Sequence, residues 1–146
     1  MDEVKKYLAC DGRVSIIIAN TTNLVEEYRK SHNLTPTTTA VMGRLLTVAG
    51  MMGHTDMKSD DENMTLQIKG GGPVGTLVAV VKKNVDDVKL KSYIQNPFVE
   101  LPTKSNGKID VGGAVGKDGF LNIIKESNRW IYRQSWRIPD GRSTVQ

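Results

Sequence analysis

The sequence predicts an α+β fold in which a mostly antiparallel sheet packs on two helices. Three observations predict it. About seven strand patterns occur in groups rather than alternating with helices, two segments have helical periodicity, and residues 64–81 have the pattern of a strand, a turn and a second strand. A length of 146 residues fits one domain, and such a chain can bury a sizeable core.

The chain is expected to begin with a hairpin. Residues 6–10 and 13–20 flank Asp11 and Gly12, and this dipeptide is typical of a two-residue hairpin turn. The β-branched run of residues 16–18 suits a buried strand. Cys10 falls at the end of the first strand, where we interpret it as a small, mostly buried residue.

Two helices are expected next. Asn23 can cap the first, with Glu26 three positions on, and His32 and Asn33 end it. Thr35 and Pro36 predict the start of a longer helix. One face of that helix carries Val41, Leu45, Val48, Ala49 and Met52, and its glycines 43, 50 and 53 indicate close approach by another backbone. The pair Met51 and Met52 could fill the core or form an adaptable binding surface.

Residues 64–81 predict the middle of the sheet. Met64, Leu66 and Ile68 alternate with polar residues, which is typical of a strand with one buried face. Glycines and Pro73 predict a turn over residues 70–75, and the nearly apolar residues 76–81 predict a strand inside a covered sheet. Further strands are expected at residues 88–93, 108–111 and 120–125.

No group of residues has the pattern of an active site. Gly116 and Lys117 lack the spacing of a phosphate loop, and Asp118 would repel phosphate. Two histidines and one cysteine match no closed zinc site. Residues 60–62 form a carboxylate cluster that we interpret as a solvated turn. We therefore expect a protein that is not an enzyme and has no cofactor.

Charge and composition limit the kinds of partner that this chain is expected to bind. The net charge is +4, of which +3 lies in residues 127–146 with their four arginines and one aspartate. Nucleic-acid binding is therefore expected only as an alternative, through that tail, where Arg and Trp side chains could stack on bases. With no signal segment, no membrane-span pattern and one cysteine, the cytoplasm is the expected location and no membrane partner is expected.

Five motifs, in order, resemble the redox-regulated 33-kilodalton heat-shock chaperonin family (heat shock protein thirty-three). They are NTTNLVEE at residues 20–27, GRLLT at 43–47 with MMG at 51–53, LQIKGGGPVG at 66–75, NP at 96–97 and DVGGAVGKDG at 110–119. The resemblance runs from about Tyr7 to Glu126 and implies a substrate-binding N-terminal core. It also implies a linker and a C-terminal zinc module whose C-x-C and C-x-x-C cysteines form a redox switch, and a dimer in the active state.

The resemblance predicts two parts in this chain. Residues 1–126 are expected to be an incomplete core, and residues 127–146 a divergent tail rich in Arg and Trp. Trp130, Ile131, Tyr132 and Trp136 could cap the exposed sheet edge, or the tail could be disordered. The zinc site is absent from this chain, and a frame slip near residue 127 is our hypothesis for the change.

The expected function is that of an ATP-independent holdase chaperone that binds unfolding clients and forms a homodimer. The expected client or dimer surface consists of Met51, Met52, Leu66, Ile68, Leu77, Val78 and Val80. The alternative is a remnant or dimerisation module without client binding.

Overall fold

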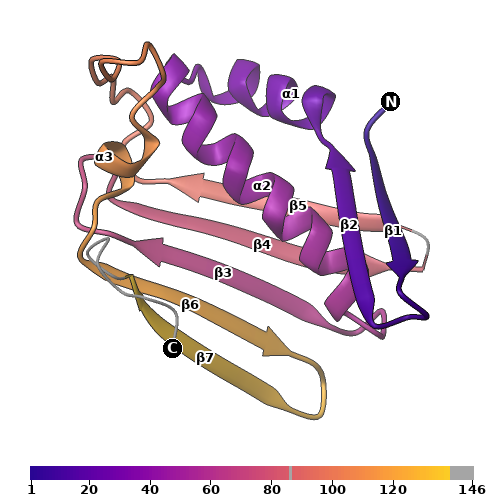
Figure 1. Ribbon diagram of the computed structural model, residues 1–146. Helices are drawn as coiled ribbons and strands as arrows, with labels where there is room; N and C mark the ends of the chain where they lie inside the picture. Colours follow the sequence, from indigo (N-terminus) through magenta and orange to yellow (C-terminus); the bar gives the residue numbers. More distant parts are fainter. Residues whose placement is uncertain (86, 139–146) are drawn as a thin grey trace.

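A five-stranded antiparallel sheet forms the body of the protein, as the computed structural model shows for residues 1–85 and 87–138 (Figure 1). Its strand order is β5-β4-β3-β6-β7. The bounds are β3 Asn63–Lys69, β4 Thr76–Asn84, β5 Asp87–Ile94, β6 Gly119–Glu126 and β7 Ile131–Ile138. The α+β fold with an antiparallel sheet is confirmed.

The helices cover one face of this sheet (Figure 1). They are α1 Thr22–His32, α2 Pro36–Asp56 and the short α3 Val111–Val115. The buried core lies between α2 and the sheet, where Met42 and Ala49 of α2 and Met64, Leu77 and Val81 of the sheet are fully covered. No helix in the described part of the chain is long and apolar enough to cross a membrane.

A separate two-stranded ribbon, β1 Glu3–Ala9 and β2 Val14–Asn20, lies beside the helices (Figure 1). The hairpin is confirmed, but its turn has four residues, because Ala9 pairs with Val14. Two expectations were wrong. Cys10 is exposed in the turn with a φ of 52°, and Ile16 and Ile18 are exposed at 44% and 56%. A two-stranded ribbon has too little sheet behind it to cover both faces of its apolar run.

The α1 cap differs from the prediction. The helix begins at Thr22, and Asn23 lies inside its first turn. The Asp2 carboxylate instead accepts hydrogen bonds from the backbone N–H groups of Asn23 at 2.9 Å and Leu24 at 2.6 Å. The chain end therefore supplies the cap that satisfies the free donors of the helix. The predicted end is confirmed, because Asn33 adopts the left-handed conformation.

The start of α2 is as predicted: Thr35 accepts from the N–H of Thr38, and Pro36 is the first helical residue. Much of the helix is buried. The close approach at its glycines involves side chains rather than another backbone. A Cβ added at Gly43 would lie 3.1 Å from a methyl of Val25, and one at Gly53 would lie 2.6 Å from a methyl of Val81.

The glycine-rich turn between β3 and β4 packs against the segment that follows α3. The N–H of Gly72 donates to the carbonyl of Val115 at 3.0 Å, and the N–H of Asp118 donates to Gly70 at 3.1 Å. A Cβ at Gly72 would meet backbone atoms at 2.4 Å. The hairpin interpretation is confirmed. The strand expected at residues 108–111 was wrong, because Asp110 accepts from the N–H of Gly113 and so caps α3.

The loop after α2 is less solvated than predicted. Glu62 is buried, and its carboxylate accepts hydrogen bonds from the N–H of Lys58 and the hydroxyl of Ser59, both at 3.1 Å. Lys125 lies 4.0 Å away and donates to the carbonyl of Asp56 at 2.6 Å. The carboxylate therefore anchors this loop to β6, and the interpretation of residues 60–62 as a solvated turn was wrong for Glu62.

Residues of the predicted tail continue the sheet. Strand β7 pairs with β6 over its whole length, from Glu126 opposite Ile131 to Gly119 opposite Ile138. Of the two alternatives for the tail, edge capping is confirmed for residues 131–138. Residues 139–146, the remainder of the predicted tail, lie outside the described residues.

Candidate functional site

An apolar groove of about 270 Å³ lies between α2 and the sheet. Three groups of residues form it. Helix α2 forms one wall, β3, β4 and β6 supply the floor, and α3 closes one end. The lining residues are Val41, Arg44, Leu45, Val48, Met52, Leu66, Ile68, Leu77, Val111, Val115, Leu121 and Ile123. Every one except Arg44 is apolar.

The depth of the groove follows from the alternation along its strands. Leu66 and Leu77 point towards α2 and are buried, so they form the floor. Val48 is 43% exposed and Met52 is half-buried, so these two side chains form the accessible rim. Helical spacing places Val48 and Met52 on the same side of α2, one turn apart.

The structure brings four of the seven predicted surface residues together. Met52, Leu66, Ile68 and Leu77 line the groove. Met51, half-buried on α2, is not among the lining residues. The remaining two, Val78 and Val80, point to the other face of the sheet, because they alternate with the buried Leu77, Ala79 and Val81. A role of these seven residues in client or dimer contacts stays a prediction.

Several lining residues were missed by sequence reasoning. Val48 was expected on the same helix face as Val41 and Leu45, but these two are buried and Val48 lies at the rim. Leu121 and Ile123 come from β6, whose apolar alternation was visible in the sequence. That alternation could have identified them. Val111 and Val115 belong to α3, and no local pattern in the sequence indicated that this segment folds back over the sheet.

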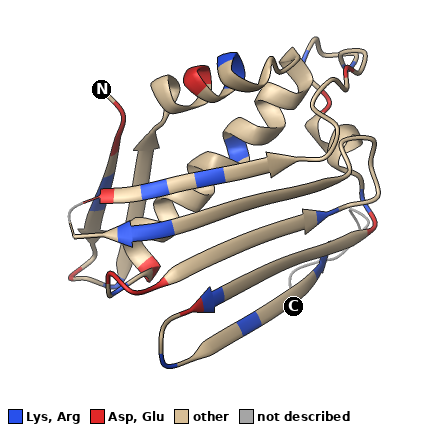
Figure 2. Cartoon of the chain, turned by 180° about the vertical axis from the view of Figure 1, so that it is seen from behind, with Lys and Arg blue, Asp and Glu red and all other residues tan. Residues whose placement is uncertain are grey.

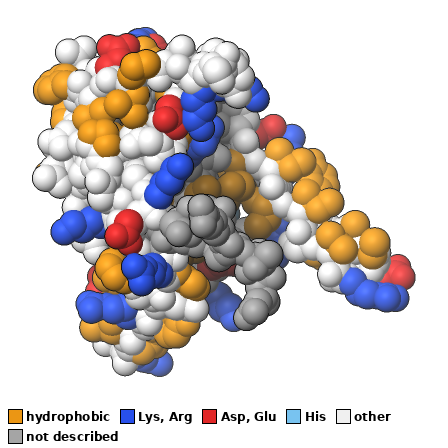
Figure 3. Space-filling view, turned by 60° about the vertical axis from the view of Figure 1, so that its left-hand side comes forward, with side chains coloured by type: hydrophobic (Ala, Val, Ile, Leu, Met, Phe, Trp, Pro, Cys, Tyr) orange, Lys and Arg blue, Asp and Glu red, His pale blue; other side chains and the backbone are white. Residues whose placement is uncertain are grey.

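The apolar surface continues from the groove onto β7. Leu121 of the groove pairs with Trp136, and Lys125 pairs with Tyr132, so both aromatic side chains point to the helix-covered face. Trp136 is 39% exposed and Tyr132 is 51% exposed. Hydrophobic side chains are visible on several parts of the surface in Figure 3. Trp136 therefore adjoins the groove, and Tyr132 lies on the same face beyond Gln134 and Lys125.

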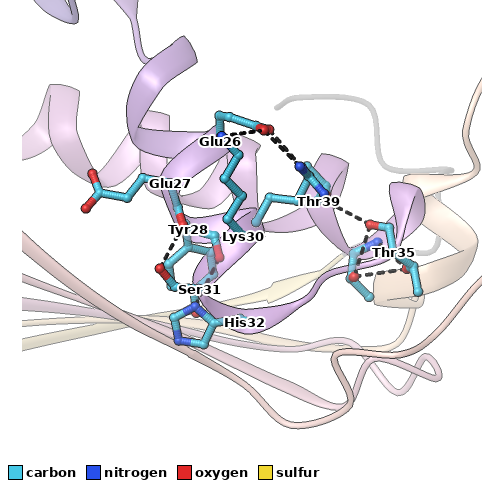
Figure 4. A network of polar contacts seen from close by, with 10 residues as sticks. Glu26, Glu27, Tyr28, Lys30, Ser31, His32, Thr35 and Thr39 are labelled. Carbon is cyan, nitrogen blue, oxygen red and sulfur yellow. Dashed lines mark hydrogen bonds and ion pairs between the residues drawn. The ribbon is translucent and has the colours of Figure 1, made fainter.

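Among the described residues, the charged groups with shifted pKa values are not part of the groove lining. Hydrogen bonds from Arg29, at 2.7 and 2.8 Å, lower the pKa of Glu26 on α1 to about 2. Figure 4 shows Glu26 with its polar contacts on this helix. The N–H of Gly113 and the amine of Lys104 lower the pKa of Asp110. These are a surface ion pair and a helix cap. A groove with an apolar lining and no converging acid or base suits hydrophobic contact rather than bond chemistry.

The residues present do not fit the zinc site that the family resemblance implies. Such a site needs several thiolate ligands, and this chain has Cys10 alone, exposed in the β1–β2 turn. Within residues 1–85 and 87–138, no three His, Cys, Asp or Glu side chains are grouped so that they could hold a metal ion.

Comparison with protein families gives a match over nearly the whole chain. The model of the Hsp33 protein family matches residues 2–141. A 33 kDa chaperonin of Acetivibrio thermocellus is 44% identical over 125 residues, and one of Clostridium beijerinckii is 42% identical over 125 residues. These alignments cover 86% of this chain but 40% and 41% of the relatives, so the chain spans about two-fifths of their length.

A solved structure has the same fold. The crystal structure of the 33 kDa chaperonin (heat shock protein 33 homolog) from Thermotoga maritima superposes with a TM-score of 0.82 at 29% sequence identity. The superposition covers 94% of this chain and 46% of that one. The ribbon, the helices and the sheet described above therefore correspond to part of that larger protein.

Proposed function

This chain belongs to the Hsp33 family, and we propose that it binds unfolding client proteins without ATP and without catalysing a reaction. The observation that carries the proposal is the apolar groove beside α2, with its accessible rim at Val48 and Met52. The matched relatives are named chaperonins, and the chain spans two-fifths of their length, so client binding by this chain is inferred from its own surface.

Hydrophobic burial supplies the affinity in this proposal. An unfolding chain exposes Leu, Ile, Val and Phe side chains, and burying one of them fully is worth roughly 1.5–3 kcal/mol. The unbranched Met52 side chain can adjust to different client residues, which suits a site without a sequence preference. Trp136 and Tyr132 extend the contact area beyond the groove.

The binding is proposed to be independent of redox state and of zinc. The chain has one cysteine, which cannot form an intrachain disulfide. We expect the same client binding with and without peroxide. A Cys10→Ser variant controls for disulfides between two copies, because Cys10 is exposed.

Suppression of citrate synthase aggregation by the purified chain tests the proposal. Val48→Asp places a charge at the rim of the groove and should remove most of the suppression, because burying a carboxylate against apolar clients is costly. Val85→Asp is the matched control, since Val85 is 71% exposed and does not line the groove. Equal activity of the two variants, or no suppression by the wild-type chain, would contradict the proposal.

We also propose that the chain forms a homodimer in the cytoplasm. Val14, Ile16, Ile18 and Tyr7 lie on one face of the β1–β2 ribbon, and each is more than 40% exposed. An apolar face of this kind marks an interaction surface. A dimer without client binding, detected by sedimentation velocity together with the aggregation assay, would favour a dimerisation module instead.

A further inference from the structure

The cations on the two faces of the five-stranded sheet differ in their contacts with the rest of the protein. On the helix-covered face, Lys83 donates to the carbonyl of Met57 at 2.8 Å and Lys125 donates to that of Asp56 at 2.6 Å. Those two lysines hold the end of α2. The open face of the sheet carries six other cations, namely Lys69, Lys82, Lys89, Lys91, Arg133 and Arg137. Figure 2 shows the blue segments of the sheet from this side.

The open-face cations are available for a partner. The lysines among them and Arg133 are exposed, and among the described residues Arg137 is the one with an ion pair, to Asp118 at 3.4 Å. The acidic residues of this face, Asp87 and Glu126, lie at strand ends. Four of these six cations come from residues 1–126, so the structured strands carry a basic face although most of the net charge comes from residues 127–146.

The register arranges this face in rows across the strands. In one row, Phe120 lies between Lys69 and Arg137. In the next row, Tyr93 lies beside Val78. A third row runs from Lys91 on β5 to Arg133 on β7. Neighbouring strands are about 4.8 Å apart, so five strands place the basic edges roughly 19 Å apart.

Exposed aromatic rings and a polar ladder lie between these edges. Tyr93 is 56% exposed and Phe120 is 53% exposed. Between them, the amide of Asn122 donates to Gln67 at 3.1 Å and accepts from the hydroxyl of Ser135 at 2.6 Å. The open face thus combines exposed cations with two flat rings on the strands of the sheet.

We propose that this open sheet face, through Lys89, Lys91, Arg133, Tyr93 and Phe120, binds single-stranded nucleic acid. Cations attract the phosphates, and bases stack on exposed aromatic rings with little dependence on sequence. Sheet surfaces with exposed aromatic residues bind two or three unpaired bases in this way. An acidic polypeptide would use the same cations but would gain nothing from stacking on the two rings.

The proposal is independent of the client groove, which lies on the opposite face of the sheet. Its test measures fluorescence anisotropy with labelled oligouridylate and oligodeoxythymidylate of about 12 nucleotides, the two sources of this chemistry. A polyglutamate peptide of similar charge is the acidic competitor. With four to six cations engaged, the logarithm of the binding constant should fall with the logarithm of salt with a slope of about −3 to −4.

Two pairs of variants separate the surface from net charge. Lys89→Glu with Lys91→Glu should weaken oligonucleotide binding at least tenfold. Lys6→Glu with Arg13→Glu makes the same charge change on the β1–β2 ribbon, where both residues are exposed, and should have much less effect. Tyr93→Ala should weaken binding about tenfold, whereas Phe98→Ala, at an exposed aromatic residue of the loop after β5, should not.

Three results would overturn the proposal. The first is no saturable binding of either oligonucleotide at low salt. The second is an equal loss in both charge-reversal pairs, which would indicate net charge alone. The third is polyglutamate binding as tight as oligonucleotide binding together with no effect of Tyr93→Ala, which would assign the face to an acidic polypeptide. Circular dichroism melts of each variant check that the fold is kept.

Discussion

Gly50 and Gly53 lie on the same helix, but an added methyl group would meet different surroundings at each. At Gly53, a Cβ would lie 2.6 Å from a methyl of Val81 and 2.7 Å from one of Val88. At Gly50 the nearest atom, a methyl of Leu90, is 3.6 Å away, which is ordinary contact. The packing therefore leaves no room for a methyl group at position 53, whereas position 50 has room for one.

We expect Gly53→Ala to destabilise the protein by about 1–3 kcal/mol, because two strands would have to move. Gly50→Ala should instead be neutral or stabilise it by up to about 1 kcal/mol, since alanine favours the helix. The free energy of unfolding in urea, followed by circular dichroism, measures both. Equal effects of the two substitutions would show that the helix does not pack against the sheet as described.

The ion pair between Glu26 and Arg29 can be tested by a titration at low pH. The hydrogen bonds from Arg29 hold the pKa of Glu26 at about 2, below its ordinary value of about 4.3. The ion pair therefore contributes stability that is fully present above the ordinary pKa and lost as the pH falls through about 2. A carboxyl NMR titration should give this low pKa.

The Arg29→Gln variant is the control for this titration. Removal of the guanidinium should return the pKa of Glu26 towards its ordinary range, because the remaining cation, Lys30, lies 3.4 Å away and is exposed. A wild-type Glu26 that titrates near its ordinary pKa would show that the ion pair is not formed in solution.

At the level of elements, β7 is one of the two edge strands of the five-stranded sheet, the other being β5. It pairs with β6 on one side and has no strand beside it on the other side within the described residues. Without β7, the backbone groups of β6 would become an open edge, which promotes pairing between molecules. The strand therefore protects the middle of the sheet from contact with other copies.

We expect a chain that ends after Glu126 to melt at a lower temperature and to aggregate more than the wild type. A chain that ends after Ile138 keeps the β6–β7 pairing and is the control. Light scattering during a thermal ramp measures both. If the two shortened chains behave alike, the pairing of β7 adds nothing to the stability of the sheet.

An element boundary was predicted correctly where the residues that determine it lie close together in the sequence. Thr35 followed by Pro36 fixed the start of α2, since a hydroxyl cap and a preset φ both act within one turn. The signal at Asn23 was incomplete in this sense, because the true cap is Asp2, 21 residues earlier. The exposure of Ile16 likewise depends on what packs over the ribbon, which no local pattern contains.

At the scale of the whole molecule, only part of the groove could be predicted from the sequence. Its floor residue Leu66 follows from the alternation along β3, whereas the nearly uniform apolar sequence of β4 has no alternation that separates Leu77 from Val78. Val115 could not be placed there, because its position depends on contacts with a turn more than 40 residues away. The basic sheet face could not be found by counting charges along the chain. Alternate residues of a strand point to opposite sides of the sheet, so a count along the sequence does not show which cations share a face.

The ribbon gives a prediction for the assembled protein. If two copies meet through the apolar ribbon face, Ile16→Lys combined with Ile18→Lys should make the chain monomeric, because both side chains are exposed on that face. The melting temperature of the wild type should rise with protein concentration, and that of the variant should not. Sedimentation velocity that shows only monomers of the wild type would contradict this.

The position of β3 has a consequence for synthesis on the ribosome. This central strand pairs with β4, which follows it at once, and with β6, which begins 50 residues after β3 ends. While the intervening residues are being made, the edge of β3 that later pairs with β6 stays uncovered. Each new copy therefore passes through a stage that resembles the unfolded chains it is proposed to bind, and completed copies could shield nascent ones.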